Sequence, residues 1–167
     1  TGFKKVTQSN KKLSKQPFIS LWNTKTRSEK VRFDAAESQI TCLAIHPDGH
    51  SIVTGSRDKG ISVWKLDGSL KKRIQYQAPL VDLDFSRDGE LLISADQSGL
   101  ITVLNADIAP VTSFVATSPN TLNAVSMAPD NRSLLTAHRD GSIQQWMPDG
   151  WKKSRRYQHR AEVRDIA

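Results

Sequence analysis

Only a few residues of this chain have types and spacings that could do chemistry. His46 and His50 stand four residues apart, which would suit a metal ion on a helix, but a Pro-Asp-Gly turn separates them. Asp82 and Asp84 share one face of an expected strand and could form a carboxylate pair. Because one of them replaces a small residue of a repeat, we expect a structural ion pair with a neighbouring unit rather than a functional site.

Catalytic and cofactor motifs are missing from the sequence. It contains no nucleophile elbow, no phosphate-binding glycine loop and no Cys/His metal cluster. The single cysteine, Cys42, excludes a disulfide framework, and its strand position predicts a buried, unreactive thiol. No apolar run is long enough to span a membrane. We therefore expect no enzyme activity, no metal, no cofactor and no membrane partner, with the cytoplasm or a eukaryotic nucleus as the location.

The elements that must position these residues repeat along the chain. ITCLAIHPDGHSIVTGSRDKGISVW, LVDLDFSRDGELLISADQSGLITVL and LNAVSMAPDNRSLLTAHRDGSIQQW are three versions of one pattern. A period of roughly 40–45 residues is typical of arrays with four strands per unit. The units open at Ile40, Leu80, Leu122 and Val163, and their third strands end at Trp22, Trp64, Leu104 and Trp146.

Each unit predicts four antiparallel strands. An apolar run meets a turn written PDG, RDG or PDN, and a second run follows; Asp-Gly and Asp-Asn tolerate the positive φ of tight hairpin turns. A second turn leads to ISVW, LITVL or SIQQW, and a polar stretch leads to a fourth strand. Because no segment has a helical period, the sequence predicts an all-β fold.

This order of strands and turns resembles the WD-repeat family of β-propellers, from Phe18 onward. The resemblance implies a tetrad in each blade: a His before the first strand, a Ser or Thr in the second, an Asp in a turn and the closing Trp. The chain matches these positions at Thr54, Asp58 and Trp64, at Thr136, Asp140 and Trp146, and at His159. Ala36, Tyr76 and Ser118 stand where the other histidines would be, and no Trp-Asp pair is present.

One unit departs further from the pattern. Ser98 stands at its Asp position and Leu104 at its Trp position, while Ser94 is retained. Losing Asp and Trp together is physically reasonable, because a buried carboxylate without its network would be an unsatisfied charge.

The resemblance divides the chain into a partial blade with a Lys-rich insertion (1–39, insertion 3–17), a blade (40–79), a degenerate blade (80–121), a blade (122–162) and the first strand of a further blade (163–167). About four repeats are thus present, with both ends inside a blade. Three explanations stay open. The favoured one is a portion of a longer propeller; the others are an eight-bladed ring of two copies, or a four-bladed closure in which the two ends share a blade.

The net charge of +7 is unevenly spread. The insertion carries Lys4, Lys5, Lys11, Lys12 and Lys15 without an acidic residue. Further basic residues lie on or before the fourth strands: Lys25, Arg27, Lys30, Arg32, Lys71, Lys72, Arg73, Lys152, Lys153, Arg155 and Arg156. Such clusters could bind a nucleic-acid backbone or an acidic protein, but Lys also protects edge strands from unwanted pairing. Edge protection is the favoured interpretation.

The turns between second and third strands offer more specific candidates. Arg57 and Arg139 occupy equivalent turn positions beside Lys59 and His138, and arginine is enriched where interfaces concentrate their binding energy. We expect His138 to be a half-exposed ring. The sequence thus predicts a non-catalytic scaffold that contacts another protein through these four residues. The alternative is a nucleic-acid or polyanion binder that uses the Lys-rich insertion and the basic rim.

Overall fold

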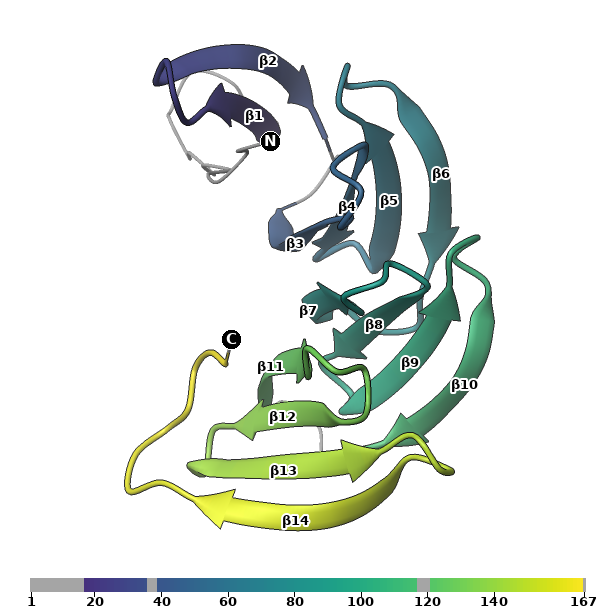
Figure 1. Cartoon of the computed structure of the whole chain (residues 1–167), viewed down its shortest axis with the longest axis vertical. Coiled ribbons are helices and arrows are strands. Elements are labelled where there is room, and N and C mark those ends of the chain that lie inside the picture. Colours follow the sequence, from purple (N-terminus) through teal and green to yellow (C-terminus); the bar gives the residue numbers. More distant parts are fainter. Residues whose placement is uncertain (1–16, 36–38, 117–120, 167) are drawn as a thin grey trace.

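A computed structural model describes residues 17–35, 39–116 and 121–166. All regular structure within these ranges is β-strand, and every pairing is antiparallel (Figure 1). One two-stranded hairpin is followed by three four-stranded sheets, which we call sheets 1, 2 and 3 in chain order. The predicted all-β fold of four-stranded antiparallel blades is confirmed.

The strands follow one another simply within each unit. The hairpin comprises β1 (Phe18–Asn23) and β2 (Ser28–Asp34). Sheet 1 comprises β3 (Ile40–Ile45), β4 (Ser51–Ser56), β5 (Gly60–Lys65) and β6 (Leu70–Gln75). Sheet 2 comprises β7 (Leu80–Phe85), β8 (Leu91–Asp96), β9 (Leu100–Asn105) and β10 (Pro110–Val115). Sheet 3 comprises β11 (Leu122–Met127), β12 (Leu134–His138), β13 (Ser142–Met147) and β14 (Lys152–Gln158).

The sheets stand side by side in an arc (Figure 1). The first strands β3, β7 and β11 lie on the inner side of the arc, and the fourth strands β6, β10 and β14 lie on its outer side. The hairpin continues the arc before sheet 1.

The turns between first and second strands have the backbone predicted from their sequences. Gly49, Gly89 and Asn131 occupy the same turn position with φ of 72°, 78° and 58°. Glycine adopts this left-handed region without strain, and asparagine tolerates it better than most residues. The PDG, RDG and PDN motifs therefore specify the hairpins directly.

The hydrophobic core lies between neighbouring sheets rather than within one. Each of three clusters takes apolar side chains from two adjacent units. A sheet is therefore buried on both faces only where it has a neighbour on each side. The hairpin and sheet 1 bury Ile19, Leu21, Ile52 and Trp64; sheets 1 and 2 bury Val53, Ile61, Leu83, Leu92 and Leu104; sheets 2 and 3 bury Ile93, Ile101, Val125, Leu134 and Trp146.

Two details differ from the sequence expectation. Trp22 holds the repeat position of the buried Trp64 and Trp146 but is only half-buried, because no described sheet precedes the hairpin. Residues 163–166 form no strand, because no described strand pairs with them in a backbone ladder. They are held by two bonds, from Val163 N to the His138 carbonyl (3.3 Å) and from Asn123 Nδ2 to the Val163 carbonyl (2.9 Å).

Candidate interaction surface

The turns that carry Arg57 and Arg139 meet the beginnings of the inner strands. The amide of Arg57 donates to the Gln39 carbonyl, and that of Arg139 donates to the Thr121 carbonyl, each at 2.8 Å. Gln97 makes the equivalent bond to Pro79 in sheet 2, at 2.9 Å. The repeat therefore places one turn residue of each sheet, Arg57, Gln97 and Arg139, beside the first strand of that sheet.

A pocket of about 250 Å³ lies at this end of the inner strands. Its lining includes Thr41, Val81, Gln97, Asn123 and Arg139. We call this end of the inner strands the mouth; it includes the pocket and Arg57 in the equivalent turn of sheet 1. Sequence reasoning missed Thr41, Gln97 and Asn123, although Gln97 could have been found because it holds the repeat position of the two arginines.

The predicted contact residues Arg57, Lys59 and Arg139 all have exposed side chains. Arg139 is 66% exposed and lies 3.8 Å from Glu162, which also accepts a bond from Asn123 (3.0 Å). Arg57 has no ion-pair partner among the described residues. Two guanidinium groups are therefore presented at this end of the sheets, one of them uncompensated.

His138 does not belong to this exposed set. The expected half-exposed ring is instead 1% exposed, and its Nε2 lies 2.8 Å from Thr136 Oγ1. Burial lowers the pKa of His138, so the neutral imidazole is favoured. A ring enclosed in this way cannot meet a partner, and His138 is removed from the contact residues.

His138 instead takes part in the hydrogen-bond network of sheet 3. Trp146 Nε1 donates to Thr136 Oγ1 at 3.0 Å, and Thr136 also bonds His138. In sheet 1, Trp64 Nε1 donates to Thr54 Oγ1 at 2.9 Å. The Trp and Thr positions carried over from the resemblance thus interact in both sheets.

The two tetrad aspartates close the turns that precede the third strands. Asp58 binds Arg73 (2.8 Å) and accepts a bond from Ser56, whereas Asp140 binds Arg156 (3.0 Å). Burial alone would raise the pKa of Asp58, but the hydrogen bonds of Ser56 and the Gly60 amide and the charge of Arg73 lower it overall. Both aspartates are structural groups that fasten an outer strand to its turn.

The position of the tetrad histidine needs a correction. The amides of Tyr76, Ala116 and His159 make the same bond to the second turn of their sheets, to Lys59 O, Gly99 O and Gly141 O. Ala116, rather than Ser118, is therefore the residue equivalent to His159; Ser118 and Ala36 lie outside the described residues. A longer loop shifted the alignment by two residues. His159 itself is exposed, and its ring contacts only the Ala161 backbone.

The degenerate sheet has moved its aspartate rather than lost it. Asp96 is 2% exposed and accepts bonds from Ser98 Oγ (2.5 Å), Ser98 N (2.8 Å) and Leu100 N (3.2 Å). In sheet 1 the order is reversed, with Ser56 bonding Asp58. Because both orders satisfy the turn, the expectation that the carboxylate had disappeared with Trp was wrong.

Asp82 and Asp84 do connect neighbouring sheets, but not as an ion pair. Asp82 accepts a bond from Val125 N (2.9 Å) and Asp84 one from Met127 N (2.8 Å), so both carboxylates bind the backbone edge of β11. Burial raises the pKa of Asp82 to about 6 and also raises that of Asp84. They are structural links between sheets 2 and 3.

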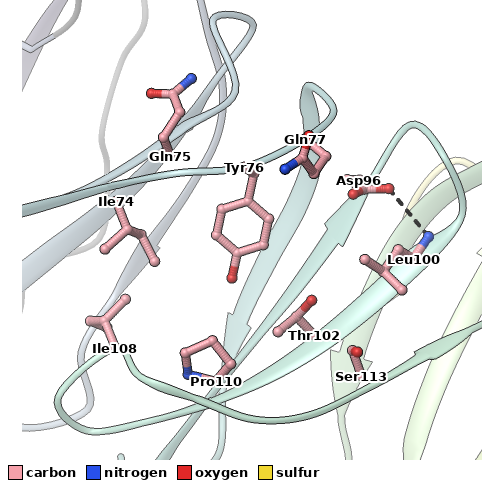
Figure 2. A pocket seen from close by; sticks show the side chains of 10 residues that line it. All are labelled: Ile74, Gln75, Tyr76, Gln77, Asp96, Leu100, Thr102, Ile108, Pro110 and Ser113. Atoms are coloured by element: carbon pink, nitrogen blue, oxygen red, sulfur yellow. Dashed lines mark hydrogen bonds between the residues drawn. The ribbon is translucent and has the colours of Figure 1, made fainter.

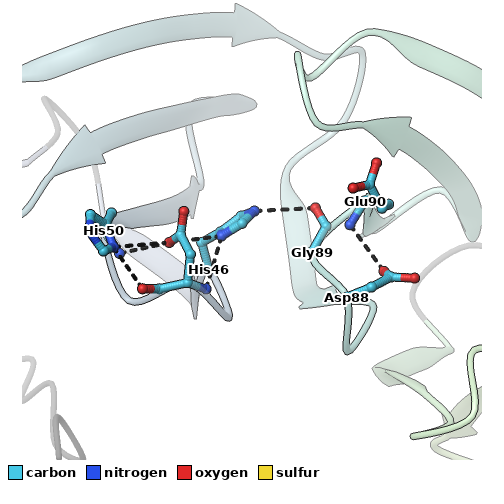
Figure 3. Close-up of polar contacts among 6 residues, drawn as sticks. His46, His50, Asp88, Gly89 and Glu90 are labelled. Carbon is cyan, nitrogen blue, oxygen red and sulfur yellow. Dashed lines mark hydrogen bonds and ion pairs between the residues drawn. The ribbon is translucent and has the colours of Figure 1, made fainter. Parts of the chain in front are cut away.

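The histidine pair is structural as well (Figure 3). His46 Nε2 lies 3.2 Å from the Gly89 carbonyl of sheet 2, and His50 Nδ1 lies 2.7 Å from the Asp48 carbonyl. Within the described ranges, no group of three or more His, Cys, Asp or Glu could hold a metal ion. Cys42 is buried, and burial raises its thiol pKa to about 12.

The basic clusters fall into two groups. The Lys-rich insertion with Lys4, Lys5, Lys11, Lys12 and Lys15 lies outside the described residues. The outer strands β2, β6 and β14 are largely exposed. Part of their charge is compensated within the chain, by the pairs of Arg32 with Glu29, Arg73 with Asp58 and Arg156 with Asp140.

The repeated geometry agrees with a sequence family. The family described as WD domain, G-beta repeat matches residues 27–65 and 109–147. The chain carries WD repeats. Each matched WD repeat begins at an outer strand, β2 or β10, and ends with the third strand of the following sheet. The sequence repeat therefore links one sheet to the next.

Relatives of these WD repeats include subunits of larger assemblies. The target of rapamycin complex subunit wat1 of Schizosaccharomyces pombe is 22% identical over 134 residues, which are 78% of this chain and 43% of that protein. The SIR4-interacting protein SIF2 of Saccharomyces cerevisiae is 35% identical over 69 residues, which are 41% of this chain and 13% of that protein. WD-repeat proteins are in general protein-interaction scaffolds.

A solved structure shares the fold. The crystal structure of RRP9 WD40 repeats has a TM-score of 0.70 and 21% identity, covering 77% of this chain and 42% of that chain. The chain therefore spans less than half the length of these relatives and of this solved structure. In the described part of the chain, no helix has the length and apolar character needed to cross a bilayer.

Proposed function

We propose that this chain is a non-catalytic scaffold that binds a partner protein at the mouth. The observation that carries the proposal is the repeated placement of Arg57, Gln97 and Arg139 beside the inner strands. Backbone hydrogen bonds hold the three equivalent turns, so the backbone positions of these residues are set before the partner arrives. Such preorganisation lowers the entropic cost of binding.

The chemistry of the mouth indicates the kind of contact. Arg57 is exposed and unpaired among the described residues, and Glu162 sits only 3.8 Å from Arg139 at the surface. Guanidinium groups bind carboxylates through paired, directional hydrogen bonds. Gln97 and Asn123 add neutral donors and acceptors. We infer a partner segment that offers carboxylate and carbonyl oxygens to this surface.

A peptide selection tests this proposal. Peptides are selected from a random library on the immobilised chain, and the dissociation constant of the best one is measured with wild type and with the double variant Arg57→Ala/Arg139→Ala. We expect the double variant to weaken binding at least about tenfold, since each lost hot-spot contact is worth more than ~1 kcal/mol.

The matched control is Lys152→Ala/Lys153→Ala, which removes the same charge from β14. It should change the dissociation constant less than about threefold. Peptides that bind the arginine variant as tightly as wild type would refute the mouth as the binding surface.

A second candidate function, polyanion binding, rests on the Lys-rich insertion and on the basic residues of the exposed outer strands β6 and β14. Displaced counterions make such binding fall steeply with salt. The test measures the affinity for a double-stranded oligonucleotide at several salt concentrations, with wild type and with Lys4, Lys5, Lys11, Lys12 and Lys15 changed to Gln. A steep salt dependence that these changes flatten would support it; an affinity insensitive to both would exclude it.

A further inference from the structure

The outer strand of sheet 2 differs from the other outer strands. β10 reads PVTSFV and carries no charge, whereas β2, β6 and β14 read SEKVRFD, LKKRIQ and KKSRRYQ. Val111 and Val115 of β10 are 60% and 69% exposed. No described strand pairs with the outer edge of β10. This edge therefore lacks the charges that usually prevent a strand edge from pairing.

Sheet 2 also lacks a set of contacts between the outer strand and the second turn that sheets 1 and 3 share, which we call the clasp. In sheet 1, Arg73 binds the Asp58 carboxylate (2.8 Å) and Gln75 Nε2 donates to the Asp58 carbonyl (2.5 Å). In sheet 3, Arg156, Asp140 and Gln158 make the same contacts at 3.0 and 2.8 Å.

The strand register identifies the corresponding residues of sheet 2. Ser113 pairs with Thr102 as Arg73 pairs with Ser62, and Val115 pairs with Leu100 as Gln75 pairs with Gly60. Ser98 stands at the position of the clasp aspartate. Ser113, Val115 and Ser98 thus replace the Arg, Gln and Asp of the clasp. Without these contacts, the face of β10 toward sheet 1 is left open.

A pocket of about 340 Å³ lies at this opening, between sheets 1 and 2 (Figure 2). Ile74, Ile108 and Pro110 supply apolar walls, and the Tyr76 ring projects between them. The buried polar groups nearby already have partners: Ser94 donates to the Tyr76 hydroxyl (3.4 Å), and Asp96 is bound by Ser98 and Leu100. Because these groups are satisfied, the pocket suits an apolar side chain rather than a polar one.

The charge beside the pocket favours one kind of peptide. β6, on the other side of the opening, carries the exposed Lys72 two residues before the pocket residue Ile74, and therefore on the same face of the strand. Lys72 Nζ donates to the Asp107 carbonyl (2.5 Å), next to Ile108 of the pocket wall, and it has no acidic partner among the described residues. A positive charge therefore borders an apolar pocket and an uncharged strand edge.

We propose that β10 and this pocket bind an extended acidic peptide segment of a partner protein. The segment adds a strand to the outer edge of β10, so that its backbone satisfies the unpaired groups of that edge. One bulky apolar side chain enters the pocket, and an acidic residue next to it in the strand pattern approaches Lys72. This surface is separate from the mouth and does not depend on the function proposed for it.

The test uses labelled peptides of the pattern Asp-Val-X-Val-Asp, in which X is Phe, Leu or Ala, and measures their affinity for the full chain by fluorescence anisotropy. The Phe and Leu peptides should bind at least about tenfold more tightly than the Ala peptide. Val111→Glu/Val115→Glu should abolish binding, because it charges the edge and repels the acidic peptide. Ser154→Glu/Tyr157→Glu, a control that places the same charge on exposed β14, should leave it unchanged.

A second variant guards against loss of folding. Asp96→Ser/Ser98→Asp/Ser113→Arg/Val115→Gln transfers the complete clasp of sheet 1 to sheet 2, so it should stay folded by circular dichroism while losing the peptide. Equal binding of the Ala and Phe peptides, or full binding by either β10 variant, would overturn the proposal. So would peptides that fail to bind at all, or a dimer of the chain that Val111→Glu/Val115→Glu dissociates. Arg57→Ala/Arg139→Ala should bind as wild type, which separates this surface from the mouth.

Discussion

At the scale of single residues, hydrogen bonds from one sheet to a backbone group of the next join neighbouring sheets. Asp82 and Asp84 satisfy the backbone amides of Val125 and Met127 on the edge of β11. The sibling positions in the other sheets are Cys42, Ala44, Ala124 and Ser126, so only sheet 2 uses carboxylates in this way. Burying them costs free energy when they are charged, which is why the pKa of Asp82 is raised to about 6.

This cost predicts a pH dependence of folding. Because the pKa of Asp82 is near 6 in the folded chain and near 4 in the unfolded chain, the folded state takes up the proton first as the pH falls. The free energy of unfolding of wild type relative to Asp82→Ala should therefore increase between about pH 7 and pH 4, by up to ~3 kcal/mol. Urea titrations of both proteins at several pH values measure it. A difference that shrinks toward low pH would contradict the assignment.

Comparing alanine substitutions at two turn glycines can measure the contact between His46 and sheet 2. Gly49 and Gly89 both have positive φ, but a Cβ added at Gly89 would lie 2.6 Å from the His46 ring, whereas one at Gly49 meets nothing within 4 Å. Alanine at either site lowers the free energy of unfolding by ~1 kcal/mol, because a residue with a Cβ is strained at positive φ. We expect Gly89→Ala to cost ~1–2 kcal/mol more than Gly49→Ala in urea unfolding.

The double variant His46→Ala/Gly89→Ala provides the check. Removing the ring should cancel most of the extra cost of Gly89→Ala, giving a non-additive cycle. Equal costs for the two glycines would show that the ring moves aside freely.

At the scale of elements, matched side chains fit each sheet to its neighbour. Phe33 of the hairpin packs on Trp64 of sheet 1 with ring centroids 5.3 Å apart, and a Cβ at Gly68 would lie 2.8 Å from the Phe33 ring. In the next interface the same three positions hold Ile74, Leu104 and Ile108, all in one cluster. Two smaller side chains have replaced the aromatic pair, and Ile108 fills the space at the glycine position.

This exchange predicts a specific rescue. Leu104→Trp alone should overpack the interface of sheets 1 and 2 and lower the free energy of unfolding by ~1–3 kcal/mol. Leu104→Trp/Ile108→Gly reproduces the Trp and Gly of the interface between the hairpin and sheet 1, and it should recover at least about half of that loss. Thermal unfolding with tryptophan fluorescence measures both variants. A double variant less stable than the sum of its single changes would show that Ile108 has another role.

At the scale of the whole molecule, stability resides in the interfaces between sheets. Leu92 of sheet 2 packs into the cluster shared with sheet 1, and Val125 of sheet 3 packs into the cluster shared with sheet 2. When each unit contacts only its neighbours, the stability of an array is close to a sum of local interface terms.

Hydrogen exchange can detect this locality. Leu92→Ala should cost ~2–5 kcal/mol and speed exchange most in sheets 1 and 2, whereas Val125→Ala should act most on sheets 2 and 3. Mass spectrometry of peptides from each sheet reports the difference. Uniform acceleration across all three sheets after either change would mean that the array unfolds as one unit.

The sequence by itself determined the strands, the turns and the family. Strand alternation and the Asp-Gly and Asp-Asn turns are local signals. The family resemblance that their repetition supports implied a tetrad with Trp64 beside Thr54 and Trp146 beside Thr136, and both pairs are hydrogen-bonded. The same repeat predicted equivalent turn positions for Arg57 and Arg139, because equivalent positions in an array share one environment.

Only the tertiary structure decided which side chains replace one another across sheets. The burial of His138, the exchange of Ser56 and Asp58 for Asp96 and Ser98, and the role of Asp82 all depend on contacts between residues far apart in the sequence. The repeat specifies where each position lies in a sheet. What a side chain does there depends on the volume and hydrogen-bonding groups of the facing sheet, and the local sequence does not contain them.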